Sequence, residues 1–180
     1  MKQQLTVSHE IELQAIQESD ARLLFDAIDH NRTYLGRWLP FVASTCEVAD
    51  SLAFICSLQH KKAEQVFKIS YRGKFGGLIG FNMVDSHNLK LEIGYWLIES
   101  LQKNGIMTRS VATLVDYAFS ELAINRVQIN CAAANVASQK IPQRLGFILE
   151  GIQRDGILLA DGHFIDCQIY SMLKREWKRL

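Results

Sequence analysis

The sequence lacks several features that would assign it to a specialised class of protein. Its four cysteines, Cys46, Cys56, Cys131 and Cys167, form no Cys-x-x-Cys pair, which argues against a zinc site and a disulfide framework. No run approaches the roughly 20 apolar residues that cross a bilayer, and the first ten residues lack the apolar core of a signal peptide. The formal net charge of +1 gives no reason to expect nucleic acid or an anionic membrane as a partner. We therefore expect a cytoplasmic protein without a metal site.

The composition is that of an ordinary globular protein. Hydrophobic residues make up 48% of the 180 residues and charged residues 22%. A chain of this length buries a core without help from metals or disulfides. Because it shows no internal repeat, low-complexity tract or linker, we expect residues 1–180 to form one mixed α/β domain.

One stretch changes its hydrophobic period in the middle of the chain. Residues 92–98 are almost wholly apolar, rich in aromatic and β-branched side chains, and too few for a helix, which predicts a buried strand. A polar turn follows over residues 99–105. Beyond it, helical spacing predicts a long amphipathic helix. Its apolar face comprises Met107, Val111, Leu114, Val115, Ala118, Phe119 and Leu122.

A strand, a glycine-containing turn and a helix together suit an anion. The first turn of a helix leaves backbone N–H groups without partners, and the helix dipole adds partial positive charge there. Gly105 lets the backbone approach a ligand closely, and Lys103 and Arg109 add positive charge. The turn is thus either a phosphate or pyrophosphate site or an ordinary strand-to-helix connection.

Several motifs resemble those of the GNAT superfamily of N-acetyltransferases. Gln102-Lys103-Asn104-Gly105-Ile106-Met107 is similar to its pyrophosphate loop, Gln/Arg-x-x-Gly-x-Gly/Ala, with Met107 in place of the last small residue. Three further segments resemble the RimJ/RimL-type branch, the ribosomal-protein N-terminal acetyltransferases. They are Glu92-Ile93-Gly94-Tyr95-Trp96, Asn135-Val136-Ala137-Ser138, and Arg144-Leu145-Gly146-Phe147 with Glu150-Gly151.

The resemblance implies a fold and a cofactor. The fold is one mixed, mostly antiparallel sheet of about seven strands flanked by helices, with a splayed parallel strand pair that binds acyl-CoA. The cofactor is acetyl-CoA: a strand would pair with its pantetheine arm, loop amides would hold its pyrophosphate, and Arg144 or Lys140 could reach the 3′-phosphate. The implied contact residues are Tyr95, Trp96, Leu97, Ile98, Gln102, Lys103, Asn104, Gly105, Ile106, Met107, Thr108, Asn135, Ser138 and Arg144.

The resemblance also implies catalytic roles. Glu92 would draw a proton from the acceptor amine, and burial in an apolar strand would move its pKa toward that of a useful base. Alternatively, Glu92 faces solvent or pairs with Lys90 or Arg126. The Ser138 hydroxyl would bond the departing sulfur or cap a helix, and Tyr170 is a second candidate proton donor, which we expect to be packed in the core.

Trp38 and Phe41 lie in the region where this family places part of its acceptor pocket, although core packing explains large aromatic residues equally well. The acceptor would be a primary amine. Roughly 10% of an α-amine is neutral at pH 7, against less than about 0.1% of a lysine amine, which favours a protein N-terminus. The alternatives are a small amine, such as a polyamine or aminoglycoside, and a non-catalytic acyl-CoA sensor. A homodimer is one of the open oligomeric states.

The rest of the chain predicts alternating elements. A helix after Ser19 should bury Leu23, Leu24, Ala27 and Ile28. Ser44 and Glu47 have the spacing of a capping box, which would open a second helix that ends at Lys61 and Lys62. Further helices are expected over residues 31–41 and 138–145. Strands are expected over residues 5–16, 66–71, 77–84, 126–132, 147–153 and 163–173.

Overall fold

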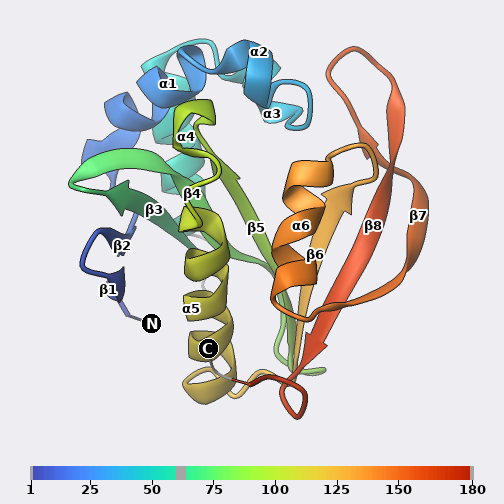
Figure 1. Cartoon of the computed structure of the whole chain (residues 1–180). Coiled ribbons are helices and arrows are strands. Elements are labelled where there is room, and N and C mark those ends of the chain that lie inside the picture. Colours follow the sequence, from blue (N-terminus) through green and yellow to red (C-terminus); the bar gives the residue numbers. More distant parts are fainter. Residues whose placement is uncertain (1, 60–63, 179–180) are drawn as a thin grey trace.

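The structure is a computed structural model that describes residues 2–59 and 64–178. Its centre is one sheet of eight strands in the order β1-β2-β3-β4-β5-β6-β8-β7, and all neighbours are antiparallel except β5 and β6 (Figure 1). The strands are β1 (Gln4–Ser8), β2 (Ile11–Ala15), β3 (Gln65–Tyr71), β4 (Lys74–Asp85), β5 (Lys90–Leu97), β6 (Arg126–Ala132), β7 (Ile148–Leu158) and β8 (Phe164–Leu173).

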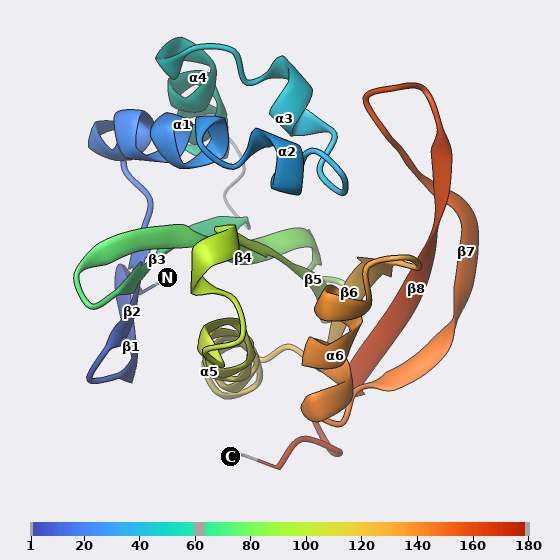
Figure 2. The same cartoon turned by 45° about the horizontal axis from the view of Figure 1, so that its top comes forward.

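Helices cover both faces of the sheet. The long α5 and the shorter α6 lie on one face, and α1 to α4 lie on the other (Figure 2). Their bounds are η1 (Glu18–Asp20), α1 (Ala21–Asp29), α2 (Arg32–Leu35), α3 (Phe41–Ser44), α4 (Val48–Gln59), η2 (Glu99–Leu101), α5 (Ile106–Ser120) and α6 (Val136–Arg144). None of the helices in the described part of the chain has the length and apolar character needed to span a membrane.

The strand β5 belongs to two hydrophobic clusters because its side chains alternate between the faces. Leu91 and Ile93 pack into the larger cluster under α5, together with Val111, Leu114 and Val115 of that helix. Trp96 packs on the opposite face with the α1 side chains Leu24 and Ile28. The strand is therefore held from both sides.

The parallel pair separates soon after it forms. β5 and β6 are joined by the α5 crossover, which makes them parallel. Their pairing covers only Lys90–Glu92 against 126–128, whereas β5 stays paired with β4 as far as Leu97. The two strands diverge beyond Glu92 (Figure 1). The resulting gap confirms the predicted splayed pair.

The sheet has one strand more than the expected seven because the N-terminal segment is a hairpin. The expected single strand over residues 5–16 turns back at His9 and Glu10, where the Glu10 N–H donates to the Ser8 Oγ at 3.3 Å. Leu5 and Leu13 then face each other across β1 and β2. Alternation alone missed this turn, since it carries neither glycine nor proline.

Several helix predictions need correction. Leu23 is 51% exposed, whereas Leu24 and Ile28 are buried as expected, and Ala27 is partly buried. The Ser44–Glu47 capping box does not form, because the Asp50 carboxylate accepts the N–H groups of Cys46 and Glu47 instead. The segment 31–41 holds the single turn α2 rather than one long helix. The predicted helix end at Lys61 and Lys62 lies outside the described residues.

The ends of other helices and strands differ from the predicted ends by a few residues. β4 begins at Lys74, immediately after a two-residue turn at Arg72 and Gly73 with φ of 50° and 74°. Such angles suit a tight hairpin, so the strand starts before the expected Gly77. α5 ends at Ser120, which leaves Leu122 beyond the helix, and β7 continues to Leu158.

Candidate active site

The turn before α5 has the geometry of an anion-binding helix start. Gly105 is the N-cap of this 15-residue helix and has φ 69° and ψ 4°, in the left-handed region that glycine tolerates best. The Arg109 guanidinium folds back and donates to the Asn104 carbonyl oxygen at 3.2 Å. The N–H groups of the first helical turn, from Ile106 onward, are therefore presented at a positively charged helix end.

A cavity of about 610 Å³ opens above this turn, between the end of β5 and α6. It brings together twelve of the fourteen residues implied by the family resemblance. These are Tyr95, Trp96, Leu97, Gln102, Lys103, Gly105, Ile106, Met107, Thr108, Asn135, Ser138 and Arg144. Ile98 and Asn104 are not among its lining residues. We call this space the cofactor cavity.

The cofactor cavity is positively charged. Lys103, Lys140 and Arg144 line it, and none of the described lining residues carries a carboxylate. Met107 is 6% exposed and belongs to the hydrophobic core as well as to the lining, so the side chain that departs from the family motif is accommodated largely by burial. The residues present fit a diphosphate ester such as coenzyme A, because backbone amides and cations converge on one opening.

Residues from α2 close the cofactor cavity. The Gln102 side-chain amide donates a hydrogen bond to the Tyr34 hydroxyl, which ties the loop to this helix. Trp38, predicted to contact the acceptor, lines this cavity, whereas Phe41 lines a second one. The structure thus separates these two aromatic residues between neighbouring sites.

Ser138 lies in a small group of hydroxyl and thiol side chains. Its Oγ is 3.2 Å from the Tyr95 Oη and 3.3 Å from the Cys131 Sγ. The Ser138 N–H donates to the Asn135 Oδ1, so Asn135 is the helix N-cap and Ser138 is not. This corrects the alternative structural role considered for Ser138.

A proline explains why the Tyr95 hydroxyl reaches α6. Pro142 has no N–H, so the Ser138 carbonyl four residues earlier lacks its usual helical partner. The Tyr95 hydroxyl donates to this carbonyl at 3.2 Å. Burial raises the pKa of Tyr95 well above its ordinary value, which keeps the hydroxyl protonated at neutral pH.

Glu92 lies on the other face of β5, at the point where the parallel pair ends. Its side chain is partly buried, and this burial raises its pKa above the ordinary value of 4.5. The Asn130 Nδ2 donates to its Oε2 at 2.7 Å. Among the described residues, neither Lys90 nor Arg126 forms an ion pair with Glu92, since they pair with Asp85 and Glu150.

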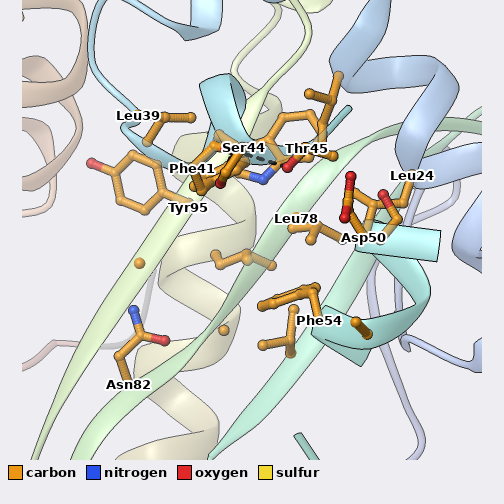
Figure 3. A pocket seen from close by; sticks show the side chains of 18 residues that line it. Leu24, Leu39, Phe41, Ser44, Thr45, Asp50, Phe54, Leu78, Asn82 and Tyr95 are labelled. Atoms are coloured by element: carbon orange, nitrogen blue, oxygen red, sulfur yellow. Dashed lines mark hydrogen bonds between the residues drawn. The ribbon is translucent and has the colours of Figure 1, made fainter. Parts of the chain in front are cut away.

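A second cavity of about 600 Å³ lies on this face, beneath α1, α3 and α4 (Figure 3). Leu24, Phe41 and Phe54 line its walls. Its floor contains Gly80 and Gly94, which are partners across β4 and β5 and so leave bare backbone. Next to them lies Asn82, the cross-strand partner of Glu92. We call this space the acceptor cavity.

The two cavities meet at three shared residues, Leu39, Tyr95 and Trp96. A group bound in one cavity is therefore next to a group bound in the other at these residues, which lie beyond the point where β6 pairs with β5. This arrangement can align two reactants for a direct transfer.

Tyr170 does not reach either cavity. It is 1% exposed, belongs to the core, accepts a hydrogen bond from the Gln143 Nε2 and donates one to the Gln168 Oε1. The expectation that it packs in the core is confirmed. Among the described residues, no group of three or more His, Cys, Asp or Glu side chains could hold a metal ion.

The sequence alone did not predict the contacts of Asn130 and Asn82 in this site, or the hydrogen bond that the Tyr95 hydroxyl donates to α6. Asn130 had a detectable signal, because Arg126, Gln128 and Asn130 alternate with apolar residues and must share one face of their strand. Asn82 and Tyr95 acquire their neighbours from β5 and α6, and no local pattern indicates those contacts.

Comparison with known proteins identifies the family. The acetyltransferase (GNAT) domain family matches residues 10–148. YdaF of Bacillus subtilis (strain 168) is 36% identical over 177 residues, with 96% of each chain covered. The ribosomal-protein-serine acetyltransferase of Escherichia coli (strain K12) is 30% identical over 176 residues, covering 96% of this chain and 98% of that protein.

Solved structures agree with this result. The RimL ribosomal L7/L12 α-N-protein acetyltransferase in complex with coenzyme A superimposes with a TM-score of 0.89 at 26% identity, covering 94% of this chain and 97% of that one. Solved structures of similar acetyltransferases contain acetyl-CoA or coenzyme A. The chain is therefore an acetyl-CoA-dependent acyltransferase of the GNAT superfamily, in its RimJ/RimL-type branch.

Proposed function

We propose that the enzyme transfers an acetyl group from acetyl-CoA to the α-amine of a protein N-terminus. The observation that carries this proposal is the junction of a cationic cavity with an apolar one at Tyr95 and Trp96, on the strand that also carries the partly buried Glu92. One cavity suits a phosphate-bearing donor, and the other suits an acceptor of low charge.

The charge of the acceptor cavity argues against a polyamine or an aminoglycoside. Asp50 is the one carboxylate among its described lining residues, and it already accepts two backbone N–H groups. Four further acidic residues that could have attracted a polycation, Glu47, Glu64, Asp85 and Asp155, do not line it. A polycation would leave most of its charges unpaired there, which is costly in a desolvated site.

Glu92 would act as the base. A carboxylate whose pKa is raised by burial accepts a proton more readily, either directly or through one water molecule. The pKa of an α-amine is about 2.5 units below that of a lysine amine, so its deprotonation at neutral pH costs ~3.4 kcal/mol less. A single carboxylate base is therefore better suited to a protein N-terminus.

The leaving thiolate would be stabilised from the opposite face of β5. The Ser138 hydroxyl and the protonated Tyr95 hydroxyl lie 3.2 Å apart and line the cofactor cavity. A thiol has an ordinary pKa of about 8.5, so hydrogen bonding from one hydroxyl gives the departing sulfur enough assistance. Asn135 would hold the pantetheine arm, and Arg144 or Lys140 the 3′-phosphate.

The activities named for the relatives support an α-amine acceptor. One is a ribosomal-protein-serine acetyltransferase, and a structural neighbour is an α-N-protein acetyltransferase for L7/L12. A ribosomal-protein N-terminus is therefore the first acceptor to test. The cytoplasmic location expected from the sequence belongs to the same proposal, and cell fractionation tests it.

The decisive experiment measures coenzyme A release from acetyl-CoA against N-terminal peptides, polyamines and aminoglycosides. We expect turnover with peptides that carry a free α-amine and none when the same peptides are N-acetylated. Turnover confined to polyamines or aminoglycosides would contradict the acceptor assignment. Tight acetyl-CoA binding without turnover on any amine would instead favour a sensor.

The oligomeric state is a separate prediction. The β7–β8 hairpin exposes large apolar side chains, among them Ile152 at 56% and Phe164 at 59%. A homodimer that covers this hairpin would bury them. Light scattering at several protein concentrations tests this, with Phe164→Ser as the variant expected to weaken association.

A further inference from the structure

A row of polar side chains runs across the sheet and ends at Glu92. Along β6, the Arg126 Nη2 donates to the Gln128 Oε1 at 3.0 Å, and the Gln128 Nε2 donates to the Asn130 Oδ1 at 3.0 Å. The Asn130 Nδ2 then donates to the Glu92 Oε2 at 2.7 Å. The three β6 residues share one face because they are two residues apart.

The chemistry of arginine fixes the direction of this row. A guanidinium has only donors, whereas each amide has one acceptor oxygen and one donor nitrogen. With Arg126 at one end, the Gln128 oxygen must accept and its nitrogen must donate onward. Asn130 is oriented in the same way, so it presents an N–H rather than an oxygen to Glu92.

The outer end of the row is anchored. Arg126 donates to both carboxylate oxygens of Glu150, at 2.5 and 2.6 Å, and the Ser171 Oγ donates to the same carboxylate at 2.7 Å. These bonds, chiefly that from Arg126, lower the pKa of Glu150 to about 2. The carboxylate is thus charged at neutral pH and keeps Arg126 in place.

The inner end of the row lies next to the acceptor cavity, although Glu92 itself is not among the lining residues of either cavity. Glu92 pairs across the sheet with Asn82, which lines that cavity, and with Gln128 in the parallel register. The row therefore approaches Glu92 from β6, while Asn82 on its β4 side lines the acceptor cavity. One carboxylate oxygen is held, which leaves the other for the acceptor.

We propose that Arg126, Gln128 and Asn130 are positioning residues, which orient the Glu92 carboxylate by imposing one hydrogen-bond direction along β6. The inference rests on the proposed function only in naming Glu92 as the base. An Asn130 amide turned the other way would place an oxygen against the carboxylate and repel it. The row prevents this without placing a second charge beside Glu92.

The charged and titratable groups around Glu92 are few. On its own face of the sheet lie Lys90 of β5, Arg126 of β6 with its partner Glu150 of β7, and Cys167 of β8, and the helical layer contributes Asp50. Burial is the main cause that raises the pKa of Cys167 and of Cys131, and the Glu92 charge adds to both. None of these groups donates to Glu92 as Asn130 does.

The test measures the Glu92 pKa directly, by ¹³C NMR of the side-chain carboxyl carbon, assigned by its loss in Glu92→Gln. Asn130→Leu keeps the shape but removes the donor, so the Glu92 pKa should rise by about one unit. Gln128→Leu and Arg126→Met keep Asn130 but release its orientation, and smaller rises are expected. Asn82→Leu is the matched control, because it makes the same change on the other flank of Glu92 without removing a donor.

Kinetics then separates this inference from the proposed function. The acidic limb of kcat at saturating acceptor should move with the NMR pKa in the same variants. A Glu92 pKa that is equal in Asn130→Leu, Asn82→Leu and wild type would overturn the positioning row, whatever the activity. A pKa that moves in an enzyme with no turnover on α-amines would support the row and overturn the proposed acceptor. Thermal unfolding of each variant excludes misfolding as the cause.

Discussion

The cofactor cavity and the acceptor cavity have almost the same volume, about 610 and 600 Å³, but opposite character. Three cations and the start of a helix line the cofactor cavity. The acceptor cavity is lined by apolar side chains, by the backbone of two glycines and by one carboxylate that already accepts two backbone N–H groups. Under the proposed function, charge and backbone amides would select the donor, whereas shape would select the acceptor. One strand, β5, serves both because its side chains alternate.

Glu92→Gln should have the largest effect. The amide keeps the shape but cannot accept the acceptor's proton, so kcat should fall by about 10²–10³-fold. The Kd for acetyl-CoA, measured by calorimetry, should stay within about twofold, because Glu92 lies on the other face of β5. Equal losses of turnover and cofactor affinity would contradict the separation of the two cavities.

The pH dependence should follow Glu92. Burial raises its pKa above 4.5, so the base is lost by protonation as the pH falls through that raised value. Below it, kcat at saturating acceptor should drop about tenfold per pH unit. The acceptor's own amine also titrates in kcat/KM, so kcat is the quantity to measure. The residual kcat of Glu92→Gln should not show this fall at acidic pH.

Gly94→Ala should damage only the acceptor side. A Cβ at this position would lie 2.4 Å from the Asn82 Nδ2, the far end of a side chain, and would push that amide into the acceptor cavity. We expect the KM for the acceptor to rise about tenfold, which corresponds to ~1.4 kcal/mol, with unchanged acetyl-CoA affinity.

Gly80→Ala is the informative contrast to Gly94→Ala. Its Cβ would lie 2.6 Å from the Gln65 carbonyl oxygen in the backbone of β3, which cannot move cheaply. This variant should lose stability rather than acceptor affinity, as urea unfolding would show. If both variants lost stability to the same extent, or both raised the KM for the acceptor, Gly94 would have no distinct role in the floor of the acceptor cavity.

Gly105→Ala should damage only the cofactor side. The position has φ 69°, and an alanine there costs about 1 kcal/mol even though a Cβ meets open space, with Arg109 Nε nearest at 3.9 Å. The Kd for acetyl-CoA should rise about fivefold. The KM for the acceptor should not change. A rise in both the Kd for acetyl-CoA and the KM for the acceptor would contradict the separation of the two cavities.

Glu150→Gln should have the smallest effect, since it lies at the far end of the polar row. The folded-state pKa of about 2 is depressed, so the ion pair contributes stability above pH 4.5 that is lost as the pH falls through 2. The Glu150 side chain is 42% exposed, which limits this contribution to less than about 1 kcal/mol. Urea unfolding of wild type and variant at pH 7 and pH 3 should show a difference that is larger at pH 7 and reduced, but not abolished, at pH 3.

Sequence reasoning located the cofactor side more completely than the acceptor side. The loop around Gly105 and the segment from Asn135 to Ser138 are contiguous motifs, and their residues meet because β5 and β6 are neighbours. The acceptor cavity is built from pieces of α1, α3, α4, β4 and β5, so its residues share no local pattern. Trp38 and Phe41 show the difficulty, since residues three apart line different cavities.

The sequence by itself determined the alternation of strands and helices, the glycine that opens α5 and the family motifs, because these depend on local periodicity and backbone sterics. Only the tertiary structure decided that Pro142 frees a carbonyl for Tyr95, that β5 and β6 part after Glu92, and that Asn130 donates to Glu92. Those contacts join residues 38 to 43 positions apart, and their geometry depends on how the sheet and helices pack together.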